Sequence, residues 1–482
     1  MKRFLLPLLL SLAACAPAVV PIAAPIPDPQ SLAAVNAERI VIAGYPEIHT
    51  PPELNKAIFV RYSLPKTAKA RAVLVLMPGF LGGAANFDRL ARSLVAKDPT
   101  LEVWAVDRRS NQLEDHSRLQ EALSKRDPSI AWRYHIRDGG TFKPLEPSQL
   151  KFMGYWGLQT HLEDLRRVLQ LARTYGQKVM LGGHSLGAVM VSLYAGWDFA
   201  GTPGYTDIDA LLLLDGVAGR TNGENGISQA DYQAGVVGPF GIRGAGQIRL
   251  EDGTAIPYFS AFGFDPNGLA KLSAAALLAR FDPNGSSPGG VVPYPASNLA
   301  AALISGDDQY ALVSAFAISA GRATNAKTSV NVLSWFVGGW ALTVDGVADG
   351  ATRVDWETPS QTDPTELTDP LDFATRFYNQ NADFQEWYFP ARLSLDIGAV
   401  GLEAPAWARE NLRVRHVAST KIPVMAIRGG RGIVTEPNAY QPLERKMQQK
   451  IEVRNLPGMT HLDVLAARAN PSVDWILELS QK

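Results

Sequence analysis

Ser185 is the residue whose surroundings most clearly predict chemistry. It lies in the segment Gly182–Gly187 (GGHSLG), between the apolar run Lys178–Leu181 and a helical stretch, Ala188–Trp197. A serine on a sharp turn between a strand and a helix is exposed at the edge of a sheet, and small flanking residues avoid a clash with its strained backbone. The helix N-terminus favours a developing negative charge. The segment therefore predicts a nucleophilic serine.

The segment Gly183–Gly187 resembles the nucleophile elbow of lipases and esterases of the α/β-hydrolase family. The resemblance covers residues 57–215 and 422–482. It implies an α/β-hydrolase core, in which helices cover a mostly parallel sheet. It also implies cleavage of carboxylic esters through an acyl-enzyme on Ser185, with no metal and no organic cofactor.

The resemblance also directs the search for a general base. In the family the base is a histidine that follows the serine along the chain. Only His416 and His461 follow His184. His416 stands among basic residues, which disfavour an imidazolium. His461 follows the last apolar run and precedes the last helical region, where the family carries its histidine, so we expect His461 to be the base.

Backbone N–H groups must bind the oxyanion that forms during such a reaction. The family takes one of them from the residue after the nucleophile, here Leu186. The other comes from a loop after an early strand, commonly His-Gly followed by the donor. Here that strand ends in Met77-Pro78-Gly79-Phe80, with Pro78 in place of the histidine. Matching Gly79 to the family glycine makes the N–H of Phe80 the second donor.

The family's catalytic triad consists of the serine, the histidine and an acid that orients the histidine. Here the position of the acid differs from the common family pattern. The usual position falls on Gly432, which has no carboxylate. Some members place the acid one strand earlier, and there Asp215 ends the run Ala210–Leu214. Asp215 is therefore the expected acid, with Glu436 as its rival. Asp463 is too near His461 in sequence to be a natural partner.

The rest of the chain predicts the elements that position these residues. Short apolar runs without polar alternation are typical of a parallel sheet covered on both faces. They alternate with helical patterns, which indicates an open α/β sheet. The expected strands are 57–62, 72–77, 101–106, 178–181, 210–214, 423–427 and 451–453, and the expected helices are 87–96, 156–175, 186–197 and 472–479.

The alternation of apolar runs and helical patterns stops between Gly216 and Lys421. A structureless loop of that length is improbable, so residues 216–421 are expected to form a cap or lid over the site, with a helix around 298–320. Its aromatic residues, Trp335, Phe336, Trp340, Trp387 and Phe389, would partly line an acyl-binding pocket. A smaller insertion, 108–155, is strongly charged, and most of its charges are expected to be solvated. The core is then 37–215 and 422–482.

The first residues predict export and lipidation. Met1-Lys2-Arg3 is a basic start, and an apolar run follows up to Ala14, a pattern typical of a secretory signal peptide. It ends in Leu12-Ala13-Ala14-Cys15, which looks like a bacterial lipobox, and Cys15 is the only cysteine of the chain. We expect residues 1–14 to be a lipoprotein signal peptide and 15–36 an Ala/Pro-rich tether. The lipid on Cys15 would hold the protein at a membrane in the cell envelope, outside the cytoplasm.

The composition of the chain excludes one class of function. The chain has 482 residues, 46% of them hydrophobic, and a formal net charge of -1, which argues against nucleic-acid binding. The expected partner is a small-molecule or lipid-like ester. Three alternatives remain open: amide or peptide hydrolysis by the same triad, acyl transfer to an alcohol, and a non-catalytic binding protein. Labelling by a fluorophosphonate would separate an enzyme from a binding protein.

Overall fold

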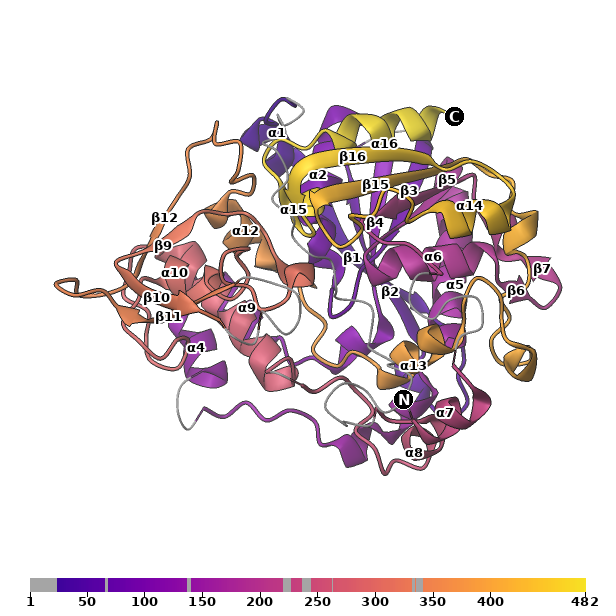
Figure 1. Ribbon diagram of the computed structural model, residues 1–482, viewed down its shortest axis with the longest axis horizontal. Coiled ribbons are helices and arrows are strands. Elements are labelled where there is room, and N and C mark those ends of the chain that lie inside the picture. Colours follow the sequence, from indigo (N-terminus) through magenta and orange to yellow (C-terminus); the bar gives the residue numbers. More distant parts are fainter. Residues whose placement is uncertain are drawn as a thin grey trace.

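The computed structural model describes residues 24–482 except 66–67, 137–139, 220–226, 236–243, 262, 332–333 and 335–340. Its centre is an eight-stranded sheet with the order β1-β2-β4-β3-β5-β8-β15-β16 (Figure 1). Only β2 runs antiparallel to its neighbours in this sheet, and the other adjacent strands pair in parallel. The strands are β1 (Asn36–Ala43), β2 (Lys56–Ser63), β3 (Ala70–Met77), β4 (Leu101–Asp107), β5 (Gly176–His184), β8 (Ala210–Leu214), β15 (Val424–Arg431) and β16 (Glu452–Thr460).

Helices cover both faces of this sheet. Along β3, Val73 and Val75 pack in one apolar cluster with α5 (Leu158–Tyr175) and α6 (Leu186–Ala195). Leu74 and Leu76 pack in a second cluster with α2 (Asp88–Lys97) and α16 (Ser472–Gln481). Successive side chains of a strand point to opposite faces, so a continuous apolar run needs cover on both. The predicted α/β class with a mostly parallel, doubly covered sheet is confirmed.

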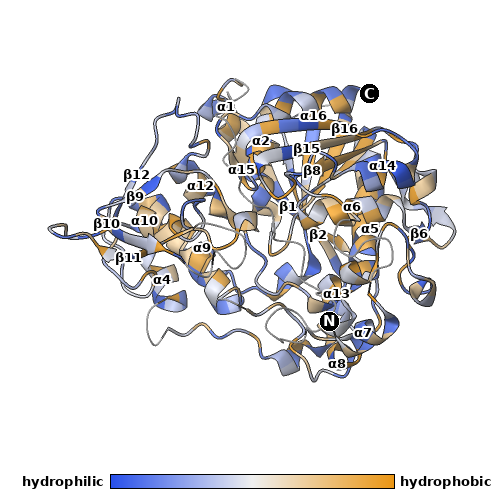
Figure 2. Cartoon of the chain, viewed as in Figure 1, coloured by the Kyte–Doolittle hydropathy of each residue, from blue (hydrophilic) through white to orange (hydrophobic). Residues whose placement is uncertain are grey.

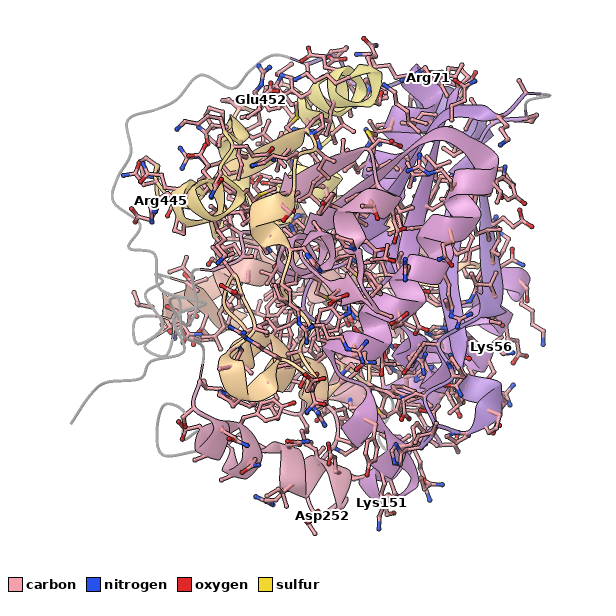
Figure 3. The ribbon with its side chains drawn as sticks, turned by 90° about the vertical axis from the view of Figure 1, so that its right-hand side faces the viewer. Lys56, Arg71, Lys151, Asp252, Arg445 and Glu452 are labelled. Atoms are coloured by element: carbon pink, nitrogen blue, oxygen red, sulfur yellow. The ribbon has the colours of Figure 1, made fainter. Side chains whose placement is uncertain are left out.

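Hydropathy follows this arrangement. The central strands and α6 are mainly hydrophobic, whereas the outer helices carry a hydrophilic side (Figure 2). Labelled charged side chains such as Lys151, Asp252 and Arg445 point outward from the ribbon (Figure 3). No helix among the described residues is both long and apolar enough to span a membrane.

The long insertion between β8 and β15 lies on two sides of the sheet domain (Figure 1). One part contains α9 (Pro266–Phe281), α10 (Asn298–Leu303), α12 (Pro370–Phe377) and the short strands β9 (Arg322–Thr324), β10 (Ala326–Val330), β11 (Leu342–Val347) and β12 (Asp355–Glu357). The other contains α7 (Gln229–Ala234), α8 (Gln247–Glu251) and α13 (Ala391–Ala399), and α13 packs against α5. The remaining elements include α3 (Ser117–Lys125), α4 (Ser129–His135), α14 (Gln441–Met447), α15 (Asp463–Ala466), β13 (Tyr378–Asn379) and β14 (Ala382–Asp383).

The helix predicted around 298–320 is wrong beyond its first turns. The helix α10 ends at Leu303, whose carbonyl accepts the N–H of Gly306 at 2.8 Å. The Asp307 carboxylate then accepts backbone N–H groups from Gln309 and Ala320, at 3.1 Å each. An aspartate that binds nearby backbone offers the chain an alternative to a helix. The segment therefore turns instead of continuing.

One further expectation differs from the structure. The helix α1 (Pro29–Ala34) lies within the expected tether, and Leu32 is buried against the core, where Arg92 donates to its carbonyl at 3.1 Å. In the charged insertion 108–155, most of the described charged side chains are at least partly exposed, as expected, and Arg108 and Arg109 are buried exceptions. Both arginines directly follow β4, at its carboxyl end. Residues 1–14 and Cys15 lie outside the described part of the chain.

Candidate active site

Ser185 lies on a strained turn between β5 and α6. Its φ and ψ are 57° and −123°, and its N–H donates to Leu214 O at 2.9 Å. A Cβ at position 183 would lie 2.2 Å from Gly187 O, and one at position 187 would lie 2.0 Å from Met77 O. The prediction that the flanking positions must be small is confirmed. Strain of this kind persists only where the surroundings hold it in place, and it is common at functional sites.

The structure brings His461 and Asp215 together at the same edge of the sheet. His461 follows β16 and Asp215 follows β8, so both stand at the carboxyl ends of parallel strands, as Ser185 does. Open α/β sheets bind their ligands at this edge. His461 Nδ1 lies 2.6 Å from Asp215 Oδ2, and both side chains are buried. A carboxylate can only accept, so Nδ1 carries the proton and Nε2 keeps the lone pair that a base requires.

Backbone donors hold the Asp215 carboxylate in place. It accepts N–H groups from Gly429 at 3.1 Å, Ile433 at 2.8 Å and Val434 at 3.4 Å. All three come from the end of β15 and the turn that follows it, where the common family pattern would place the acid. The rival Glu436 is exposed, a short distance beyond the same turn. The other candidate base, His416, lies beside Asp198 at 3.8 Å.

His184, which sequence reasoning left without a role, supports His461. The two rings pack with their centroids 4.2 Å apart, and His184 Nε2 lies 3.0 Å from His461 O. Burial lowers the pKa of His184 well below its ordinary value, so the ring is neutral. Its Nε2 must then carry the proton that it donates to the carbonyl. His184 lies within the elbow, directly before Ser185, and no local sequence pattern predicts its contact with a residue 277 positions away.

The insertion holds the loop that carries His461. Ala317 O accepts the N–H of Leu462 at 3.1 Å and the hydroxyl of Thr460 at 2.7 Å. Asp463 accepts the hydroxyls of Ser319 and Thr368, at 2.7 Å each. Asp463 therefore binds the insertion to the histidine loop and is not a partner of the imidazole.

The two expected oxyanion donors flank Ser185. We call Pro78–Gly82, which follows β3, the oxyanion turn. A Cβ at position 79 would lie only 2.8 Å from Ser185 Cβ, so this turn lies directly against the serine. In the described part of the chain, neither the Phe80 amide nor the Leu186 amide donates a hydrogen bond within the protein. Both amides are therefore free to bind an oxygen of a bound molecule.

Aromatic rings from the insertion gather around Phe80. We call Phe80, Phe259, Phe264, Phe316 and Phe389 the aromatic patch. Phe80 lies 4.9 Å from Phe259 and 4.7 Å from Phe389, between ring centroids, and Phe316 lies 4.9 Å from Phe264. All except Phe389 are only partly buried. The insertion thus adds apolar surface beside the oxyanion turn.

The predicted acyl-pocket residues divide into three groups. Trp335, Phe336 and Trp340 lie outside the described residues. Phe389 belongs to the aromatic patch. Trp387 is fully buried and donates its indole N–H to Asp383 at 3.1 Å, so it packs the interior of the protein.

Two groups among the described residues bring three potential metal ligands together, Glu114 with His116 and Asp383, and Asp307 with Asp308 and Glu366. In the first, His116 Nε2 lies 2.9 Å from Glu114 Oε2 and 3.5 Å from Asp383 Oδ2. Burial opposes the charge, yet hydrogen bonds to Asp383 and Glu114 raise the pKa of His116 to about 10. In the second, Arg431 pairs with Asp308. Cationic side chains therefore balance carboxylates in both groups.

Comparisons with known proteins add structural likenesses only. No protein-family model matches the chain, and no curated protein does. A candidate lipase from Sulfolobus solfataricus is 15% identical, with a TM-score of 0.48 over 93% of this chain and 95% of its own. A peroxisomal alpha-beta-hydrolase from Saccharomyces cerevisiae is 10% identical, with a TM-score of 0.39 over 93% and 88%. A thermophilic esterase from Thermogutta terrifontis is 11% identical, with a TM-score of 0.37 over 92% and 98%.

These TM-scores all lie below 0.5, so the fold is assigned from the strand order and the site geometry of this chain. Its sheet has one antiparallel strand near one edge and is otherwise parallel, in the order stated above. A strained serine follows β5, an aspartate follows β8 and a histidine follows β16, the order Ser–Asp–His along the chain. By its strand order and elbow geometry, the chain has the α/β-hydrolase fold that the sequence resemblance implies.

Proposed function

We propose that the protein is a serine hydrolase that cleaves carboxylic esters through an acyl-enzyme on Ser185. The observation that carries the proposal is the 2.6 Å hydrogen bond between His461 and Asp215, at the same sheet edge as the strained serine. A histidine held in this way by a buried carboxylate has one fixed tautomer, which is what a general base for a serine hydroxyl requires.

The mechanism follows from the assigned roles. Ser185 Oγ attacks the ester carbonyl carbon while His461 Nε2 takes the hydroxyl proton. The carbonyl oxygen becomes an oxyanion, which accepts the N–H groups of Phe80 and Leu186. As the C–O bond to the alcohol breaks, His461 returns the proton to the leaving oxygen. Water then attacks the acyl-enzyme with the same base, releases the acid and restores Ser185. Asp215 stabilises the imidazolium in each half-reaction.

The aromatic patch supports a substrate with an apolar acyl or alcohol group. Its rings, four of them only partly buried, lie beside the oxyanion turn, where a bound ester would extend from Ser185. Pockets that bind small molecules are lined mostly by apolar and aromatic side chains, with few polar groups. An ester with a hydrocarbon group therefore fits this surface better than a charged one.

A fluorophosphonate probe tests the proposal, because it labels only an activated serine. The wild-type protein should be labelled, and Ser185→Ala should remove labelling and lower turnover by about 10⁶-fold. Ser192→Ala is the matched control, since Ser192 lies on α6, the helix that follows Ser185, and donates to Ala188 O at 2.8 Å. A wild-type protein that neither hydrolyses esters nor accepts the probe would refute the proposal.

We also propose that the protein acts at a membrane, anchored through a lipid on Cys15. The support is the signal-like start and the motif Leu12–Cys15, in a chain with no other cysteine. One acyl chain gives only marginal anchoring, whereas several give stable anchoring. Such an anchor would place the enzyme near lipid-like esters.

A further inference from the structure

We infer that Arg108, paired with Glu386 of the insertion, is a positioning residue that fixes the backbone of the oxyanion turn. The inference rests on the proposed function, because it concerns how the Phe80 N–H comes to face the reacting oxygen. Arg108 itself touches no substrate in this proposal. It acts from behind the turn, through three carbonyl groups.

The contacts of Arg108 are concentrated on that turn. Its guanidinium donates to Pro78 O at 2.8 Å, Gly79 O at 2.6 Å and Gly82 O at 3.0 Å. Its Nε donates to Glu386 Oε2 at 2.7 Å. The side chains of Arg108 and Glu386 are 1% and 0% exposed, so water does not compete for these bonds. A planar guanidinium is suited to several acceptors in fixed directions.

The bond to Gly79 O decides which way the donor points. The Gly79 carbonyl and the Phe80 N–H belong to one peptide unit, and in a trans peptide they point in opposite directions. Arg108 holds the carbonyl on one side, so the N–H must face the other. A flip of this peptide would turn the carbonyl toward the site and remove the donor. The guanidinium opposes that flip because it would lose its acceptor.

The turn needs this support because it is strained. Leu81 has a φ of 57°, a value that a branched side chain adopts only under constraint. The insertion adds backbone bonds from the far side: Glu386 N–H donates to Leu81 O, and Gly83 N–H donates to Phe384 O, at 2.9 Å each. Ser110 Oγ also donates to Glu386, which keeps the carboxylate directed at Arg108. The insertion is thus part of the scaffold of the oxyanion site.

If Arg108 only stabilised the fold, replacing it would have the same effect as replacing any other buried arginine of an ion pair. The neighbouring Arg109 provides that comparison. Arg109 forms a similarly buried pair with Asp164, with two bonds of 2.7 Å. Its other donors reach Tyr45 O and Asn55 Oδ1, and none reaches the oxyanion turn. Arg109→Met therefore removes a comparable buried ion pair without touching the turn.

The experiment compares Arg108→Met, Arg108→Lys and Arg109→Met with the wild type in the full chain. We would measure the melting temperature, kcat and KM on an apolar ester, and Ki for a trifluoromethyl ketone. That ketone mimics the transition state: Ser185 Oγ adds to its carbonyl carbon, the hydroxyl proton passes to His461, and the carbonyl oxygen becomes the oxyanion. Its affinity therefore reports on the oxyanion donors, whereas KM reports mainly on ground-state binding.

For Arg108→Met we expect kcat to fall by about 10²- to 10³-fold, the usual effect of losing one oxyanion donor. Ki should rise by a similar factor while KM stays nearly constant. Arg108→Lys should recover part of both losses. Arg109→Met should lower the melting temperature but leave kcat and Ki near wild type. A folded Arg108→Met that matches Arg109→Met in kcat and Ki would overturn the inference.

If Arg108→Met fails to fold, Glu386→Gln takes its place because it preserves the side-chain shape. It should lower kcat and ketone affinity in the same proportion, and wild-type values for both would overturn the inference. A wild-type protein without ester hydrolysis or fluorophosphonate labelling would instead refute the proposed function. The two failures are therefore distinguishable.

Discussion

The carboxylate of Asp215 occupies the space that a side chain at position 432 would need. A Cβ at that position would lie 2.1 Å from Asp215 Oδ2 and 2.6 Å from its Cγ. Gly432 lies where the common family pattern places the acid. Because it has no side chain, it leaves room for the Asp215 carboxylate, which comes from the neighbouring strand. The two positions are coupled: a carboxylate after β8 requires a residue without a side chain in the turn after β15.

Gly432→Ala should lower turnover although the position carries no functional group. The added methyl would push the Asp215 carboxylate away from His461, and a misplacement of about 1 Å can cost about 10²-fold in rate. Steady-state kinetics on one ester would measure the loss. Gly430→Ala is the control on the same segment, since the three atoms nearest to its Cβ would be backbone atoms, the closest at 3.1 Å, and none belongs to Asp215. Equal activity of the two variants would contradict the coupling.

Asp215→Asn should leave the fold intact and lower kcat by about 10⁴-fold, as loss of the correct tautomer does in a comparable triad. Glu436→Gln should cost little, because Glu436 is exposed and the imidazole already has its carboxylate. Both variants must be assayed on the same substrate. A crippled Glu436→Gln beside a nearly normal Asp215→Asn would show that the acid is Glu436.

His161 should make the folded protein sensitive to acid. It is buried, with Nδ1 2.7 Å from Gly157 O, and burial lowers its pKa from 6.5 to about 3. Between these values the unfolded chain binds a proton that the folded protein excludes. The free energy of unfolding should therefore fall as pH decreases below 6.5, by about 1.4 kcal/mol per pH unit from this group.

Denaturant titrations of wild type and His161→Gln between pH 7 and pH 4.5 would isolate this contribution. Glutamine can still donate to Gly157 O but does not titrate. The wild type should lose stability more steeply than the variant over this range. Parallel curves would mean that His161 takes up a proton without unfolding.

Cys15→Ser should release the protein from the membrane fraction and leave its activity unchanged. The expected acyl chains would be lost, while the folded core that begins near α1 would remain complete. Fractionation followed by fluorophosphonate labelling measures location and activity in one sample. A variant that still sediments fully with membranes would place the anchor elsewhere.

The sequence predicted most of the sheet because its signals are local. The buried strands β3, β4 and β8 are apolar runs, and Ser185 is marked by a short glycine pattern. The helix α9 was missed because it is buried nearly all round, with apolar and small residues instead of one apolar stripe. Arg108 was not distinguished from the solvated charges of its insertion, although it directly follows a buried strand. Its partner, Glu386, lies 278 positions away, and no local pattern predicts such a pairing.

The hydrogen bond between His461 and Asp215 joins residues 246 positions apart, with the whole insertion between them. Such distant pairings form late in folding, because closing a long loop costs conformational entropy before the contact can stabilise the chain. A nascent chain that has completed the elbow at Ser185 still lacks its base. If the protein is exported and crosses the membrane unfolded, it is inactive in transit. Catalytic competence would then arise only where folding ends, and the compartment of synthesis would never be exposed to the active enzyme.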